Sequence, residues 1–292
     1  MLTGELLEKV RKIEIKTRKL VEEITGGAYH SVFKGRGIEF SEVREYTSDD
    51  DIRDIDWNVT ARMGTPYIKK YAEERELNVM LAVDASASGL FGSRREKREQ
   101  MIEAAALLAF SAIRNNDKVG LLVFTDRTEL YLPPRSGKTH GMRVIRELVA
   151  MEPKGRGTDI GRALESLARG LKKRSVVFLI SDFLDDRDYE KTLKIVSRKH
   201  DVIAFRIQDH AELELPCSLP GLTLEGLEDG RSFLFSAGSS RALKAYAESA
   251  RELRERTDEI CRHAKVDMVD AMSDEDLVKP LLRFFRNRRV KR

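Results

Sequence analysis

Three polar segments of the chain carry side chains that could hold a metal ion. Asp84, Ser86 and Ser88 directly follow an apolar run, Thr158 lies in a glycine-containing segment, and Asp182 ends a second apolar run. Hydroxyls, a few carboxylates and retained waters suit a hard octahedral cation, whereas zinc prefers His or Cys. The pattern predicts magnesium (Mg2+) or manganese (Mn2+), bound directly by the three hydroxyls, with the two acids holding waters or orienting the hydroxyls.

Asp-x-Ser-x-Ser by itself is a weak signal, because Asp and Ser also cap helices and form turns. The two later segments strengthen it. Each apolar run is typical of a buried parallel strand, and the carboxyl ends of such strands meet at one edge of a sheet, where ligands bind. The three segments are therefore expected to converge on one site.

From Asn78 onward, strand-like runs alternate with helical periods. The predicted strands cover 78–84, 118–124, 128–132, 175–181, 201–207 and 266–271, with a possible hairpin near 222–236. The predicted helices cover 94–115, 140–151, 159–172, 188–199, 240–264 and 273–286. This alternation predicts an α/β fold with a doubly wound, mainly parallel sheet and helices on both faces.

The order of the polar residues resembles the metal-ion-dependent adhesion site of von Willebrand factor A domains. That site combines Asp-x-Ser-x-Ser, a Thr and an Asp, and the match is complete at Asp84, Ser86, Ser88, Thr158 and Asp182. The resemblance covers about residues 77 to 272 and implies the doubly wound sheet of that family. In the family, the open metal position usually receives a Glu or Asp carboxylate from a partner protein.

Upstream motifs point to a narrower family. They are Gly35–Phe40, Val43–Tyr46, Asp50–Arg53, Ile55–Asn58 and Thr60–Arg62. Together they resemble the bacterial family called domain of unknown function 58, whose members carry a von Willebrand A-like module and commonly accompany AAA-type ATPases of the MoxR group. This resemblance spans about residues 25 to 272. One departure is Ser48-Asp49, where the family usually has Pro-Gly.

Four segments follow from these patterns: an N-terminal helix over 1–24, a small strand-and-loop subdomain over 25–76, the von Willebrand A-like domain over 77–272, and a C-terminal helix with a basic tail over 273–292. The apolar stripe of the first segment fits a helix packed on the domain, or one that binds a partner or dimerises. The basic tail is expected to be a solvated terminus, although it could contact nucleic acid or anionic lipid.

The second segment contains Trp57 and Tyr67, which we predict to be aromatic anchors. Its acids could form a second metal site or a nuclease centre, but interleaved arginines favour a salt-bridged structural network. The acids are Asp49, Asp50, Asp51, Asp54 and Asp56, and the arginines are Arg44, Arg53 and Arg62.

Composition agrees with a globular protein. The 292 residues are 41% hydrophobic and 35% charged, and the net charge of +4 does not call for nucleic acid. We find no signal peptide and no apolar run long enough to span a bilayer, so a cytoplasmic location without a membrane span is expected. Some relatives in the resembled family carry membrane helices near the N-terminus, which is a second departure. Cys217 and Cys261 are expected to be free thiols.

Other catalytic classes fit poorly. The Gly137-Lys138-Thr139 segment lacks the first glycine of a phosphate loop, and two prolines precede it. The five histidines show no zinc-ligand spacing, and Ser86 lacks the elbow motif of serine hydrolases.

Two functions of different classes remain. The first is a non-enzymatic protein-binding module that captures an acidic residue of a partner, which the family resemblance implies to be a MoxR-type AAA ATPase, in assembly or maturation. The alternative is a metal-dependent phosphoester hydrolase centred on Asp84 or on the acids at 49–56, for which the sequence offers no clear general base. A scaffold with an unused site is a third possibility. The oligomeric state does not follow from the sequence.

Overall fold

The chain forms two compact units, one over 34–76 and the other over 1–33 together with 77–292. The computed structural model describes residues 8, 10–14, 39–47, 50–72, 76–215, 221–236 and 238–290. Residues 8 and 10–14 are helical, and the rest of the helix predicted over 1–24 lies outside the described residues. Cys217 also lies outside them, whereas Cys261 is a buried free thiol.

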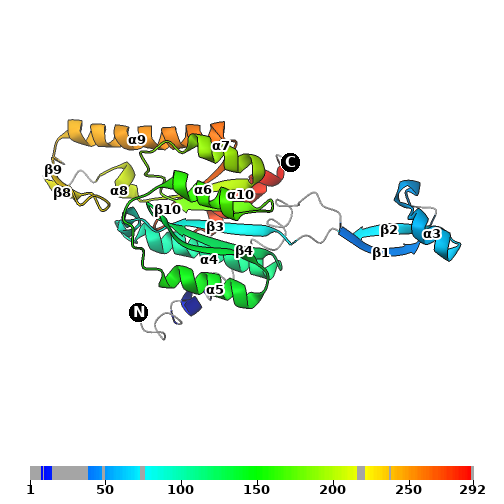
Figure 1. The fold of residues 1–292 in the computed structure, drawn as a ribbon. Coiled ribbons are helices and arrows are strands. Elements are labelled where there is room, and N and C mark those ends of the chain that lie inside the picture. Colours follow the sequence, from blue (N-terminus) through cyan, green and yellow to red (C-terminus); the bar gives the residue numbers. More distant parts are fainter. Residues whose placement is uncertain are drawn as a thin grey trace. The chain divides into compact units, whose positions relative to one another are not determined.

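The large unit is built on a six-stranded sheet with the order β10-β7-β6-β3-β4-β5 (Figure 1). All neighbouring strands are parallel except β4 and β5. The strands are β3 (Asn78–Asp84), β4 (Lys118–Phe124), β5 (Thr128–Arg135), β6 (Val176–Ser181), β7 (Asp201–Gln208) and β10 (Asp267–Met272). The chain adds strands on one side of β3 and then crosses to the other side, so β3 and β6 flank the point where the strand order reverses.

Helices cover both faces of this sheet, as Figure 1 shows. Successive residues of β3 alternate between two apolar cores: Leu81 and Val83 pack with α4, α5 and α10, whereas Met80 and Ala82 pack with α6, α7 and α9. Because each face is buried, the strand reads as one continuous apolar run. The helices are α4 (Lys97–Arg114), α5 (Lys138–Ala150), α6 (Ile160–Gly170), α7 (Glu190–Lys199), α8 (His210–Leu213), α9 (Ser240–His263) and α10 (Val278–Val290). The predicted doubly wound α/β fold is confirmed.

A separate two-stranded hairpin, β8 (Leu222–Glu225) and β9 (Ser232–Phe235), occupies the predicted region. In the part of the chain that the structure describes, no helix is both long and apolar enough to cross a bilayer.

The small unit pairs β1 (Glu39–Glu45) with β2 (Tyr67–Ala72) in an antiparallel ribbon and holds a short helix, α3 (Trp57–Met63), between them. Two of its acids start helical turns. Asp51 caps a 3-10 helix, and Asp56 caps α3 by accepting from two backbone N–H groups. An ion pair of 2.6 Å joins Arg44 and Asp50. Helix α3 was not predicted. Of the expected salt-bridged network, the described residues show the Arg44–Asp50 ion pair, and Asp51 and Asp56 act as helix caps instead.

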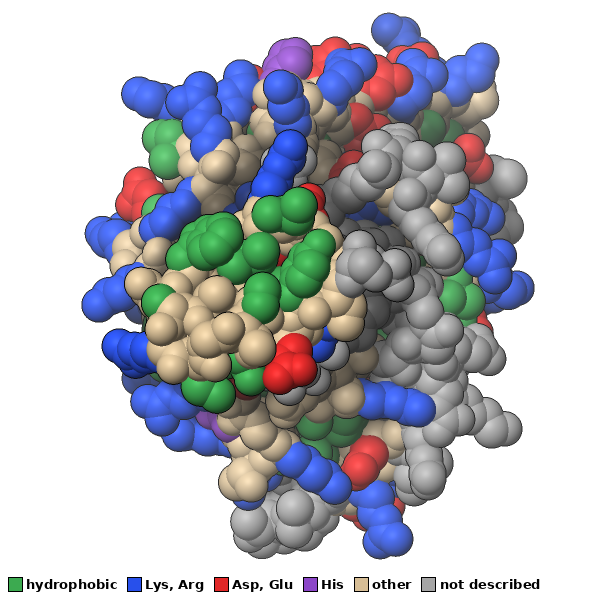
Figure 2. All heavy atoms as spheres, turned by 90° about the vertical axis from the view of Figure 1, so that its right-hand side faces the viewer, with side chains coloured by type: hydrophobic (Ala, Val, Ile, Leu, Met, Phe, Trp, Pro, Cys, Tyr) green, Lys and Arg blue, Asp and Glu red, His purple; other side chains and the backbone are tan. Residues whose placement is uncertain are grey.

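Trp57 is not a buried anchor, which corrects the prediction. The side chains of Ile52, Trp57 and Met63 are 65%, 68% and 60% exposed. Figure 2 faces this unit and shows apolar side chains gathered on its surface. Trp57 points outward because it is the first residue of a seven-residue helix, and Ile68 supplies the buried side chain of the ribbon instead.

Candidate functional site

The carboxyl ends of β3 and β6 bring together four of the five predicted site residues. Asp84 is the last residue of β3, and Asp182 directly follows β6. Ser86 stands at the N-cap of a 3-10 helix (Ala87–Leu90), but its side chain makes no capping hydrogen bond. The hydroxyl of Ser86 instead lies 3.0 Å from that of Ser88. The simple capping role that Ser residues often have does not account for these hydroxyls.

Hydrogen bonds fix the acids around the two serines. Ser88 donates its hydroxyl to Asp182 Oδ2 at 2.8 Å. Asp84 accepts from the Ser86 backbone N–H at 2.9 Å through Oδ1 and from the Ser181 hydroxyl at 2.6 Å through Oδ2. Both acids are almost completely buried, while Ser88 is partly exposed. The cluster therefore opens to solvent on the side of Ser88.

Thr158 lies in the loop before α6. A backbone hydrogen bond of 2.8 Å, from the Ala87 N–H to the Arg156 carbonyl, connects this loop to the segment that carries Ser86 and Ser88. The hydrogen bond of the Thr158 hydroxyl goes to an acid and not to the serines. This hydroxyl donates to Glu228 Oε1 at 2.7 Å, and the Thr158 backbone N–H donates to Glu228 Oε2 at 3.2 Å. The fifth predicted residue thus bonds to an acid that sequence reasoning did not identify and that lines the same cavity as Ser88 and Asp182.

A buried lysine already compensates one acid of the cluster. Lys97, the first residue of α4, is fully buried, and its Nζ lies 2.6 Å from Asp182 Oδ2 and also contacts Glu212. Burial favours the neutral form of Asp182, but the Lys97 ammonium and several hydrogen bonds hold the pKa of this carboxyl below its usual value. Burial, together with the charge of Asp182, raises the pKa of Asp84. The site therefore holds one firmly ionised acid and one that resists ionisation.

The donor set fits magnesium better than zinc. Two adjacent ligands of an octahedral Mg²⁺, each about 2.1 Å from the ion, stand about 3.0 Å apart. The Ser86 and Ser88 hydroxyl oxygens have this separation, 3.0 Å. Among the described residues, no three His, Cys, Asp or Glu side chains gather as a metal-binding group. A metal at this edge would accordingly depend on hydroxyl ligands, which zinc does not favour.

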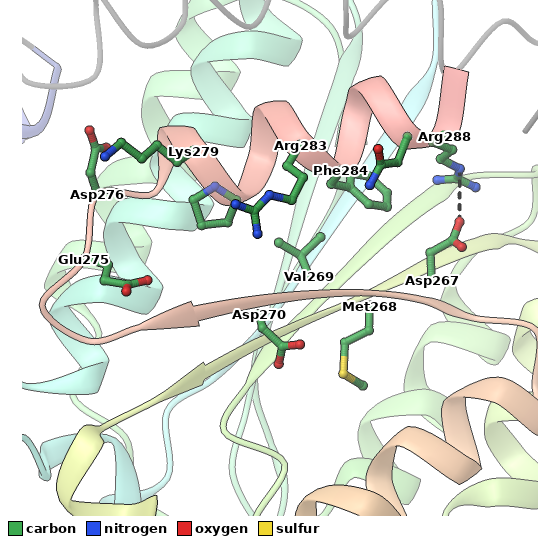
Figure 3. A pocket seen from close by; sticks show the side chains of 12 residues that line it. Asp267, Met268, Val269, Asp270, Glu275, Asp276, Lys279, Arg283, Phe284 and Arg288 are labelled. Atoms are coloured by element: carbon green, nitrogen blue, oxygen red, sulfur yellow. Dashed lines mark ion pairs between the residues drawn. The ribbon is translucent and has the colours of Figure 1, made fainter. Parts of the chain in front are cut away.

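A cavity of about 790 Å³ adjoins the cluster. Ser88, Asp182 and Glu228 are among its lining residues, and the β8–β9 hairpin and α9 contribute apolar side chains. Charged and polar side chains also line it, among them Arg206, Gln208 and Arg254. A second cavity, of about 540 Å³, lies between β10 and α10 (Figure 3) and contains none of the predicted site residues. There Arg288 pairs with Asp267 at 3.2 Å and also with Asp201.

Comparison with known proteins identifies the family. The model of the family described as "Protein of unknown function DUF58" matches residues 42–256. This chain belongs to the DUF58 family. An uncharacterized protein of Mycobacterium tuberculosis (strain ATCC 25618 / H37Rv) is 29% identical over 288 residues, which cover 97% of this chain and 90% of that protein.

Two solved structures are reported for comparison. BatB from Bacteroides thetaiotaomicron is 17% identical with a TM-score of 0.47, and the match covers 74% of this chain and all of the other. The SpRpn10 VWA domain is 14% identical with a TM-score of 0.39, and the match covers 71% of this chain and 94% of the domain.

Lys97 and Glu228 are the two site residues of this DUF58 protein that the sequence did not reveal. Lys97 lies in a run of charged residues, which is typical of a solvated helix start. Glu228 lies in the turn of a hairpin, 70 residues from the threonine that it contacts. The sequence predicted the hairpin near 222–236, but a predicted hairpin does not indicate which residue the carboxylate in its turn will contact.

Proposed function

We propose that this DUF58 protein is a non-enzymatic protein-binding module that captures an acidic residue of a partner through Mg²⁺ or Mn²⁺. The metal would be held by Asp84, Ser86, Ser88, Thr158 and Asp182. The observation that carries the proposal is the convergence of the Ser86 and Ser88 hydroxyls, hydrogen-bonded to each other at 3.0 Å, with two buried acids at one edge of the sheet. When bound, the ion would supply an electrophilic position that accepts a carboxylate.

The residues have distinct roles in this proposal. Ser86, Ser88 and Thr158 would be direct ligands, so few charges would reach the ion. Asp84 is held by the Ser86 N–H and the Ser181 hydroxyl, which suits an acid that binds a metal-coordinated water. Lys97 offsets the charge of Asp182 and so lowers the demand for a second cation.

Binding is favoured over phosphoester hydrolysis by the chemistry of the site. No histidine stands among the described residues that line the adjoining cavity, and Lys97 is occupied by two carboxylates. Membership of the DUF58 family and the upstream motifs support a MoxR-type AAA ATPase as the partner, in assembly or maturation in the cytoplasm.

Calorimetric titration of Mg²⁺ and Mn²⁺ tests the metal site. Wild-type protein should bind saturably, and Ser86→Ala and Ser88→Ala should each weaken binding at least about 10-fold, because each removes a ligand. Ser166→Ala is the matched control, since its hydroxyl bonds within α6 and to Thr128, outside the site. Unchanged affinity in both site variants would refute the ligand assignment.

Co-purification with the MoxR-type ATPase of the same organism tests the partner. Capture should require Mg²⁺, be abolished by chelation and be lost in Ser88→Ala but not in Ser166→Ala. Capture that persists in chelator and in Ser88→Ala would show that the ATPase binds elsewhere on the chain.

A further inference from the structure

The site has a carboxylate neighbour within the same chain. Glu228 lies in the turn between β8 and β9, and both of its carboxylate oxygens accept hydrogen bonds from Thr158. One bond comes from the threonine hydroxyl at 2.7 Å and the other from the backbone N–H at 3.2 Å. The carboxylate is therefore directed at one of the residues proposed to bind the metal.

Backbone contacts set the position of this turn. Gly226 and Arg231 close it with a 2.8 Å bond from N–H to carbonyl, and Gly230 donates to the Gly226 carbonyl at 2.7 Å. Arg156, in the loop that carries Thr158, donates to the Leu227 carbonyl at 3.1 Å. Glu228 thus reaches Thr158 from a turn that is itself tied to the same loop.

The position of Glu228 is costly without a cation. Glu228 is half-buried and lines the same cavity as Ser88 and Asp182. Within the described part of the chain, no ion pair involving Glu228 is recorded. A carboxylate held beside other acids needs a compensating positive charge, and Lys97 is already paired with Asp182 and Glu212.

The hairpin is not part of the central sheet. Among the described residues, strands β8 and β9 pair with each other and with no other strand, and Phe233 and Leu234 are 56% and 82% exposed. The cavity of about 790 Å³ separates the hairpin from the residues beneath it. An edge contact between the rings of Phe235 and Tyr246, and the hydrogen bonds from Arg156 and Thr158 to the turn, join the hairpin to the rest of the unit.

We propose that Glu228 is a metal ligand supplied by the chain itself, in the position that a partner's carboxylate takes. The β8–β9 hairpin then caps the site, and a partner acid must displace Glu228 to bind. This inference rests on the proposed function, because it assumes the metal held by Asp84, Ser86, Ser88, Thr158 and Asp182. It adds Glu228 to the five proposed residues of the metal site and makes this carboxylate a competitor of the partner's carboxylate for the metal.

Two measurements with Mg²⁺ alone test the inference. In calorimetry, Glu228→Gln should bind Mg²⁺ at least about 10-fold more weakly than wild type, because the amide is a poorer ligand than the carboxylate. Glu225→Gln, an exposed position in the same hairpin, should bind like wild type. In hydrogen exchange, Mg²⁺ should slow the amides of 222–235 in wild type and leave them unchanged in Glu228→Gln.

The outcomes separate this inference from the proposed function. If Ser88→Ala loses Mg²⁺ binding while Glu228→Gln binds as tightly as wild type, the metal site stands and the inference is overturned. Mg²⁺ that binds more weakly to Glu228→Gln without slowing hairpin exchange in wild type also overturns it, because Glu228 then acts only through its charge. If wild type does not bind Mg²⁺, both proposals fall.

Discussion

Asp84 and Asp182 are neighbouring buried carboxylates that the protein treats in opposite ways. Burial and the charge of Asp182 raise the pKa of Asp84 to about 7. Burial also acts on Asp182, but the ammonium of Lys97 and hydrogen bonds lower the pKa of that carboxyl. Near neutral pH, the Asp84 carboxyl is therefore only partly ionised. A cation that binds beside Asp84 would release the carboxyl proton, so metal affinity and pH are linked.

Without metal, Asp84 should make stability fall as pH rises. Its folded pKa of about 7 exceeds the ordinary 3.8, so the folded state binds more protons than the unfolded state between these values. The stabilising contribution is complete below pH 3.8 and lost as pH passes about 7, with a slope of up to about 1.4 kcal/mol per pH unit. Other carboxyls with shifted pKa values are present in both proteins, so the test is the difference between them. In urea unfolding across this range, the stability of wild type should fall more steeply with pH than that of Asp84→Asn, by up to this slope.

Asp186→Asn is the control for this measurement, because Asp186 is exposed. The unfolding free energy of Asp186→Asn should depend on pH as that of wild type does. Parallel pH profiles for wild type and Asp84→Asn would contradict the assigned titration of Asp84.

Removing the buried cation should be costly. In Lys97→Met, Asp182 and Glu212 lose their compensating charge while Asp182 remains buried. Breaking a buried ion pair in this way costs about 3 to 5 kcal/mol of unfolding free energy. Lys194→Met removes an i,i+4 pair with Glu190 at the surface and should cost at most about 1 kcal/mol. Urea unfolding measures both, and equal losses would show that Lys97 is not buried with its acids.

At the scale of elements, apolar runs predicted the strands from β3 onward well, because a strand buried on both faces is apolar throughout. Helix α3 was missed because it has only seven residues and is defined by its ends, Asp56 and the left-handed Gly64, not by periodicity. Strand β5 was predicted to end at 132 but continues to Arg135 through Pro133-Pro134. It lies at the sheet edge, and its pairing with β4 is irregular between Val119 and Leu121, so the edge and this irregularity accommodate the two prolines.

The same reasoning limits what the sequence predicts about the site. Asp84, Ser86, Ser88 and Asp182 follow strand ends, so the parallel topology alone places them together. Their role as metal ligands remains a prediction. Lys97 and Glu228 reach the site by packing between elements distant in sequence, which no local pattern encodes.

Of the two adjacent aromatic residues in helix α10, Phe285 should contribute more than Phe284 to holding the helix on the sheet. Phe285 is fully buried in the core shared with α4 and α5, whereas Phe284 is only partly buried and contacts the guanidinium of Arg288. Phe285→Ala should lower the free energy of unfolding by about 3 to 5 kcal/mol, and Phe284→Ala should cost clearly less. Denaturant unfolding compares the two. A larger loss in Phe284→Ala would mean that the other face of α10 meets the core.

At the scale of the whole molecule, the small unit over 34–76 carries exposed apolar side chains of its own, separate from the cores of the sheet-based unit. Figure 2 shows apolar side chains gathered on this unit, and the side chains of Ile52, Trp57 and Met63 in the unit are each more than half exposed. Contiguous exposed apolar side chains are often interaction sites. Trp57 is also the single tryptophan of the chain, so its fluorescence reports on this surface alone.

The 68% exposure of Trp57 predicts that its emission in the folded protein resembles that of tryptophan in water and moves little on denaturation. Acrylamide should quench it strongly before unfolding, because the indole is accessible. Trp57→Phe provides the blank. Emission shifted to shorter wavelength in the folded protein would contradict the exposure, and dependence of that shift on protein concentration would identify a second copy as the cover. Since the side chain makes no core, Trp57→Phe should leave the unfolding midpoint of the protein unchanged.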